Sequence, residues 1–90
     1  MLGGFTMKNF EYAPQGVCSK AMFFGIDDNK IHGLRVVGGC NGNLQGIGKL
    51  VEGMEIDDAI SRLEGIRCGS RPTSCPDQLS KALKEAKEQL

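Results

Sequence analysis

The chain is organised around residues 68–78, which read Cys68-Gly69-Ser70-Arg71-Pro72-Thr73-Ser74-Cys75-Pro76-Asp77-Gln78. Pro76 is typical of the first position of a helix, because its missing N–H would have no partner there. This predicts a helix start with Cys75 as the N-cap, Ser74 one residue before it and Gln78 three residues after it, close to a capping box. A thiol at this position faces free backbone N–H groups and the positive end of the helix dipole. Both stabilise the thiolate, which is the form that binds metals or attacks electrophiles.

Apolar residues recur at helical spacing after this start, and they predict a helix from Pro76 to about Glu88. Its solvent-exposed face carries pairs of Lys and Glu that are four residues apart. Its apolar stripe comprises Leu79, Ala82, Leu83, Ala86 and Leu90. Two shorter helices are predicted upstream, at residues 44–51 and at residues 56–64, each followed by a glycine that ends it. The earlier of these two is rich in glycine, so it needs tertiary contacts or a close neighbour to hold it.

The first half of the chain has the pattern of strands. A brief strand is predicted around residues 10–12, and two longer strands are predicted at residues 17–26 and 31–38. Between the longer strands, Asp27-Asp28-Asn29-Lys30 favours a four-residue turn, because Asp and Asn readily hydrogen-bond their own backbone. The whole pattern predicts an α+β fold, with a small antiparallel sheet of two to three strands followed by three helices packed on it.

Ninety residues are enough for one domain, which we place at residues 10–90 after a flexible extension at residues 1–9. Either Met1 or Met7 could be the natural start.

Lys plus Arg number 11, as do Asp plus Glu, and Trp is absent, so neither charge nor aromatic content favours nucleic-acid binding. No apolar run is long enough for a signal peptide or a membrane span. We therefore expect a cytoplasmic protein in which the four cysteines are metal ligands or reactive thiols before they are disulfides.

Pairing of the two long strands predicts where the first two cysteines lie. If a four-residue loop joins Ile26 to Ile31, the numbers of paired residues always sum to 57. Cys18 then lies opposite Gly39, next to Cys40 at the junction between strand and helix. The two thiols are therefore expected at the same end of the sheet.

Cys75 joins this pair if the last helix packs with its N-terminus at the same end of the sheet. Three thiols gathered in this way predict a metal site, in which Cys68 is either the fourth ligand or a bystander. Four soft ligands suit tetrahedral zinc or an iron–sulfur cluster. The spacing of the cysteines matches no standard zinc ribbon or finger, and the alternative is that they are small buried side chains at element ends.

Three other groups of polar residues have simpler interpretations. His32 is expected to be a hydrogen-bonded histidine of a strand rather than a ligand. Asp27 and Asp28 are expected to be solvated turn formers rather than acid–base catalysts. Arg67 and Arg71 flank Cys68, where they could favour its thiolate, although solvation at the surface is the simpler interpretation.

Several motifs together resemble the TSCPD domain family, whose signature is present as Thr73-Ser74-Cys75-Pro76-Asp77. The resemblance covers roughly residues 10–87, and its other motifs are Gly16-Val17-Cys18-Ser19-Lys20, Gly38-Gly39-Cys40-Asn41-Gly42-Asn43, Leu50-Val51-Glu52-Gly53 and Ile66-Arg67-Cys68-Gly69. Beside the four cysteines, these motifs make Gly39, Asn41, Thr73, Ser74 and Asp77 candidate site residues. Domains of this family occur alone and at the C-terminus of cobalamin-dependent ribonucleotide reductases.

The chain also has a more distant likeness to the U-type iron–sulfur scaffold proteins. Cys18, Cys40 and Cys75 can be laid on the three cysteine positions of that family, and the order of strands and helices agrees. Those scaffolds have an Asp shortly after the first cysteine, where this chain has Ser19-Lys20. The likeness therefore supports the fold and a thiolate metal site, and not cluster assembly as the activity.

These resemblances imply a small metal-binding domain, with zinc or an iron–sulfur cluster, that is accessory to ribonucleotide reduction and hence to DNA replication. The chain is too short to hold the radical-bearing barrel of a ribonucleoside-diphosphate reductase, and no cobalamin is expected on it. Two alternatives stay open: a thiol–disulfide module that delivers electrons to the reductase, and a metal-free interaction domain. The partner, any turnover and the oligomeric state, a dimer included, are left open by the sequence.

Overall fold

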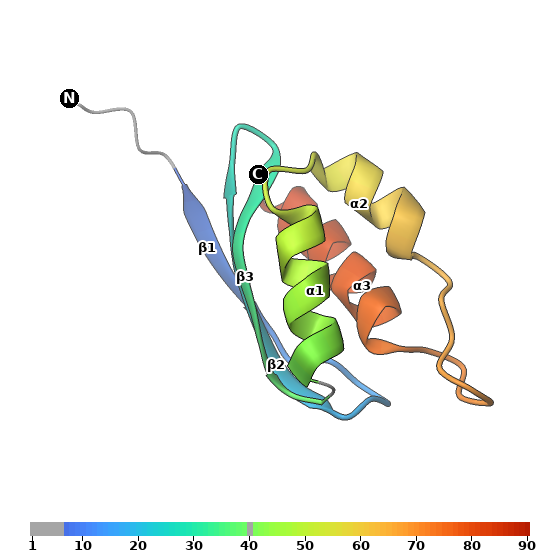
Figure 1. Cartoon of the computed structure of the whole chain (residues 1–90). Coiled ribbons are helices and arrows are strands. Elements are labelled where there is room, and N and C mark those ends of the chain that lie inside the picture. The colour runs from blue at the N-terminus through green and yellow to red at the C-terminus, as the bar shows by residue number, and fades with distance from the viewer. Residues whose placement is uncertain (1–6, 40) are drawn as a thin grey trace.

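The chain folds into a three-stranded antiparallel sheet followed by three helices, as the sequence predicts (Figure 1). The structure, a computed structural model, describes residues 7–39 and 41–90. Its elements are β1 (Lys8–Tyr12), β2 (Ser19–Asp27), β3 (Lys30–Gly38), α1 (Asn41–Val51), α2 (Ile56–Leu63) and α3 (Cys75–Glu88). The strand order is β1-β2-β3, so β2 is central. None of the helices in the described part of the chain has the length and apolar character needed to cross a membrane.

The hairpin between β2 and β3 is tighter than predicted. Asp28 and Asn29 both have positive φ, at 53° and 61°, and Asp27 pairs with Lys30. The prediction of a four-residue loop was therefore wrong, and the connection has two residues. Two successive left-handed residues give a turn whose twist matches that of the strands, and Asp and Asn tolerate this conformation better than most side chains.

A substitution at Asn29 tests whether this turn requires a residue that tolerates positive φ. We expect Asn29→Val to lower the free energy of unfolding by about 1–2 kcal/mol, because a β-branched side chain is disfavoured at positive φ. Asn29→Gly is the matched control and should be as stable as the parent protein or slightly more stable. Urea denaturation of the three proteins measures both changes. Equal stability of the Val and Gly variants would contradict the assigned turn.

The register of β2 against β3 departs twice from simple pairing. Ile26 pairs with Ile31 as predicted, but the pairing shifts by one residue between Phe23 and Gly25, so Phe23 lies opposite Arg35. A second shift next to Ser19 cancels the first, and Ser19 pairs with Gly38. Because the two shifts cancel, the start of β2 still meets the end of β3.

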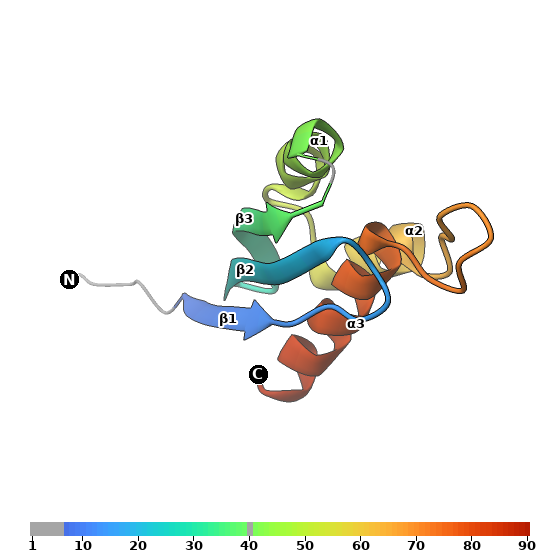
Figure 2. The ribbon, with the colours of Figure 1, turned by 90° about the horizontal axis from the view of Figure 1, so that it is seen from below.

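All three helices lie on one side of the sheet, and the core is the layer between them (Figure 1). Seen end-on, α1 lies by β3, whereas α3 lies by β2 and β1 (Figure 2). A Cβ added at Gly48 of α1 would lie 3.3 Å from the carbonyl oxygen of Leu34, so this helix does have the close neighbour that its glycines required. The buried apolar residues are Met22, Phe24, Ile26, Ile31, Leu44, Val51, Ile56, Ala59, Leu79, Ala82, Leu83 and Ala86.

The hairpin end of the sheet is tied to the end of α1 by Glu52. Its carboxylate accepts a hydrogen bond from the backbone N–H of Gly33 at 2.8 Å, and it pairs with Nδ1 of His32 at 2.8 Å. These contacts lower the pKa of Glu52 below its usual value, the Gly33 N–H having the larger effect. The prediction that His32 is a hydrogen-bonded strand residue is therefore confirmed.

Candidate functional site

The start of α3 differs by one residue from the prediction. The N-cap is Ser74, whose hydroxyl accepts a hydrogen bond from the backbone N–H of Asp77 at 3.2 Å, and Cys75 is the first helical residue. The assignment of Cys75 as the N-cap was therefore wrong. A serine oxygen accepts a backbone hydrogen bond well and a thiol does so poorly, so the neighbouring serine takes the position.

Asp77 connects the helix start to the loop that precedes it. Its carboxylate accepts hydrogen bonds from the hydroxyl of Thr73 at 2.5 Å and from the backbone N–H of Gly65 at 2.8 Å. The Thr73 hydroxyl first, and the Gly65 N–H second, hold the pKa of Asp77 below its usual value. The hydroxyl of Ser74 also donates to the carbonyl oxygen of Ile66 at 2.6 Å. Both ends of the loop between α2 and α3 are thus fastened to the start of α3.

Gln78 fastens the segment that follows β1 to the same place. Its side-chain oxygen accepts hydrogen bonds from the backbone N–H of Gln15 at 2.9 Å and from the hydroxyl of Tyr12 at 3.3 Å. Its side-chain nitrogen donates to the Thr73 hydroxyl at 3.1 Å. Thr73, Ser74, Asp77 and Gln78 therefore hold the surroundings of Cys75 in place.

Cys75 faces the first residue of β2. Its sulfur lies 3.3 Å from the hydroxyl oxygen of Ser19, and its side chain is half-buried against the core. This contact shows that α3 docks with its N-terminus at this end of the sheet, which is the condition on which the sequence placed Cys75 near Cys18. Cys18, the neighbour of Ser19, is exposed.

A cation lies beside Cys18. Nη1 of Arg71 donates a hydrogen bond to the Cys18 sulfur at 3.7 Å, across 53 positions of sequence. Arg71 belongs to a turn in which its N–H donates to the carbonyl of Cys68 at 3.0 Å, while the N–H of Cys68 donates to the carbonyl of Thr73 at 3.2 Å. Cys68 itself is exposed. The sequence favoured solvation of the Arg71 side chain at the surface. No local pattern could predict its contact with Cys18, because the folding of the loop brings these two residues together.

The remaining candidate residues lie where β3 leads into α1. Gly39 has a φ of 77°, and a Cβ added there would lie 3.0 Å from Cδ1 of Leu44 and 3.4 Å from the backbone nitrogen of Ser19. Only glycine fits this conformation in so close a space. Asn41 begins α1, and Cys40 lies outside the described residues.

The described cysteines do not by themselves form a complete ligand set. Within residues 7–39 and 41–90, no three side chains of the His, Cys, Asp and Glu types are grouped so that they could hold a metal ion. Cys18, Cys68 and Cys75 are not joined by disulfides. The structure therefore brings Cys18 and Cys75 to one end of the sheet, on either side of Ser19, and leaves Cys68 on the neighbouring loop.

Comparison with known families gives one match that covers most of the chain. The model of the TSCPD domain matches residues 6–87. No curated protein and no solved structure matches the chain.

Proposed function

Because the chain belongs to the TSCPD domain family, we propose that it is a small cysteine-based metal-binding domain accessory to ribonucleotide reductase. The TSCPD domain is known from ribonucleotide reductases, and this supports a role in that enzyme system. The metal would be zinc or an iron–sulfur cluster, both of which thiolates bind well. The barrel and the cobalamin of a reductase would belong to the partner.

The observation that carries the proposal is the contact between Cys75 and Ser19. It brings the first turn of α3 to the start of β2, one residue from Cys18, with the sulfur of Cys75 3.3 Å from the Ser19 hydroxyl. Cys75 is the first residue of α3, so its thiol lies at the N-terminus of this helix.

Cys18 and Cys75 would form a site for a soft metal if further thiols joined them. Cys40 directly follows Gly39 in the sequence, and a Cβ added at Gly39 would lie 3.4 Å from the backbone nitrogen of Ser19, so we propose Cys40 as the third ligand on the strength of this neighbour. Cys68 lies on the turn that already reaches Cys18 through Arg71, and a movement of this turn would supply a fourth. The proposed ligands are therefore Cys18, Cys40, Cys75 and Cys68.

Metal analysis of protein purified without oxygen tests the proposal. We expect about one zinc, or iron in cluster stoichiometry, per chain, and a loss of that metal in both Cys75→Ser and Cys40→Ser. His32→Ala is the control, because His32 is a potential ligand that lies at the hairpin end of the sheet and is held by Glu52. Metal that persists in both cysteine variants, or is absent from the parent protein while the thiols stay reduced, would refute the metal proposal.

The contact between Arg71 and Cys18 favours a thiol–disulfide module as the second candidate function. Reactive cysteines lie in electropositive and solvent-accessible surroundings, and Cys18 is exposed with the guanidinium of Arg71 3.7 Å from its sulfur. In this reaction two thiols of the chain would lose two electrons and two protons and form a disulfide, while a disulfide of the reductase would become two thiols. A reversible two-thiol oxidation of metal-free protein, slowed in Arg71→Ala, would favour this function over metal binding.

A further inference from the structure

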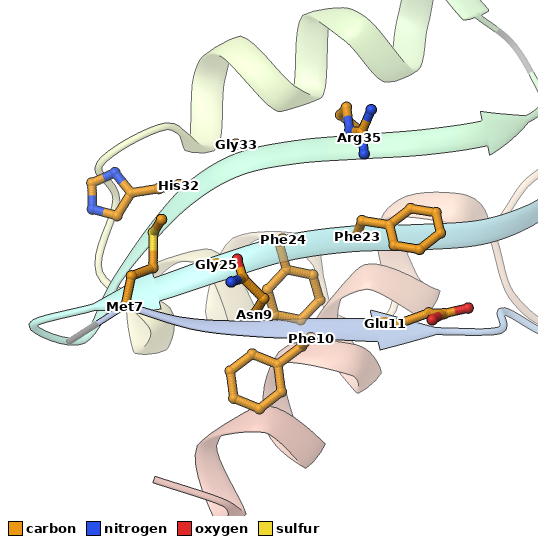
Figure 3. A pocket seen from close by; sticks show the side chains of 10 residues that line it. All are labelled: Met7, Asn9, Phe10, Glu11, Phe23, Phe24, Gly25, His32, Gly33 and Arg35. Carbon is orange, nitrogen blue, oxygen red and sulfur yellow. The ribbon is translucent and has the colours of Figure 1, made fainter. Parts of the chain in front are cut away.

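The side of the sheet that faces away from the helices carries one row of residues that is unlike a simple solvated surface. Glu11 of β1 pairs with Phe23 of β2, and Phe23 pairs with Arg35 of β3, so the three lie in one line across the sheet. Their side chains stand on the uncovered face, with the guanidinium of Arg35 5.8 Å from the centre of the Phe23 ring (Figure 3). The row thus runs from an acid through an aromatic ring to a base.

Apolar side chains flank this row. Val37 is 50% exposed and lies opposite Ala21, and Met7 is 42% exposed. Met7 reaches over Gly25, where an added Cβ would come within 2.7 Å of its sulfur (Figure 3). Residues of this face line a hollow of about 440 Å³. Apolar groups gathered around a charged row are typical of an interaction surface rather than of a solvated sheet face.

We propose that this face binds a second copy of the chain and forms a two-fold symmetric dimer of face-to-face sheets. A two-fold axis that runs along β2, between the sheets, places β1 of one copy over β3 of the other. The row then meets itself in reverse: Glu11 faces Arg35 of the second copy, the two Phe23 rings meet on the axis, and Arg35 faces Glu11 of the second copy. The surface is therefore complementary to itself in charge and in shape, as a two-fold interface requires.

The uncovered face of the sheet is small for a protein–protein interface. From the spacing of strands and the rise per residue, three strands of this length cover roughly 15 Å by 25 Å. This is smaller than the half of a standard interface, about 800 Å² per partner. An interface of this size is typical of weak, transient association, so the dimer dissociates on dilution.

Charge reversal tests this arrangement. By symmetry, Glu11→Arg creates two like-charge contacts in each dimer, as does Arg35→Glu, so each variant alone should weaken self-association roughly tenfold or more. The equimolar mixture of the two variants should restore it. In the mixed dimer one copy carries only bases in the row and the other only acids, so every contact is again between opposite charges.

Sedimentation velocity from about 5 µM to 1 mM measures the association, and native mass spectrometry with one variant isotope-labelled identifies the mixed dimer. Glu88→Arg, a charge reversal at an exposed position of α3, is the control and should dimerise like the parent protein. Circular dichroism checks that each variant is folded. A parent protein that stays monomeric over this range would overturn the proposal, as would dimers that neither single reversal weakens or a mixture that associates no better than its components.

Discussion

Replacing Asp77 by Ala should lower the free energy of unfolding by about 3 kcal/mol. The carboxylate of Asp77 is buried and accepts hydrogen bonds from Thr73 and from the backbone N–H of Gly65. Hydrogen bonds to a charged group contribute about 1.5–3 kcal/mol each, and the contributions of neighbouring bonds are not fully additive. The variant would leave both donors without their acceptor and would release the loop between α2 and α3 from the start of α3.

Urea denaturation of the Asp77→Ala variant measures this loss, with Glu88→Ala as the matched control. Glu88 is an exposed carboxylate on the same helix, and its removal should change the stability by less than about 0.5 kcal/mol. Similar stabilities of the two variants would show that the Asp77 contacts do not contribute in the way proposed. Cys75 should also become more reactive toward alkylating reagents in Asp77→Ala, because its surroundings are loosened.

The same carboxylate makes stability depend on pH in acid. The pKa of Asp77 is lower in the folded state than its usual value of about 4, so the folded protein holds the charged form more strongly than the unfolded chain does. Its contribution is therefore complete above about pH 4 and is lost as the pH falls through the folded-state pKa. The parent protein should lose more stability between about pH 5 and pH 2 than Asp77→Asn does, because the amide does not titrate.

Replacing Leu83 by Ala should lower the free energy of unfolding by about 2–5 kcal/mol, since Leu83 is 0% exposed in the core between α3 and the sheet. This loss of free energy has two parts: the removed methyl groups no longer contribute burial of apolar surface, and the cavity that they leave costs further stability. A chain of 90 residues has one small core, so a change of this size is a large share of its total stability.

Leu50→Ala is the matched control for this change, because Leu50 of α1 is 75% exposed. The same chemical change there should cost less than about 0.5 kcal/mol. Thermal and urea unfolding of the two variants give the comparison, and both should be run on protein with the same metal content, because a bound metal adds stability. A cost at Leu83 no larger than that at Leu50 would contradict the position of the core.

Local sequence patterns were sufficient for most of the elements. The apolar stripe after Pro76 predicted α3, and Gly53 and Gly65 were correctly placed just after α1 and α2, where both have positive φ. The hairpin was predicted at the correct place but with a loop of the wrong length. Its Asp and Asn suit both a four-residue turn and a two-residue turn, so the pattern alone did not separate the two.

The surroundings of the cysteines were predictable only in part. Strand pairing predicted that Cys18 lies near Gly39, but the direction in which α3 docks was left open by the sequence and is given by the contact between Cys75 and Ser19. The signature around Cys75 was visible in the sequence, but the roles of its members were not. Ser74, Thr73 and Asp77 act through partners 3 to 12 positions away.

By itself the sequence determined the class of the fold, the family, and the order and approximate ends of the strands and helices. These follow from apolar periodicity, glycines and turn residues, which act over a few neighbouring positions. Only the tertiary structure decided that Arg71 lies beside Cys18 and that Glu11, Phe23 and Arg35 form one row. These features depend on the path of a loop and on a register shift in the sheet, and interactions between residues far apart in the chain set both.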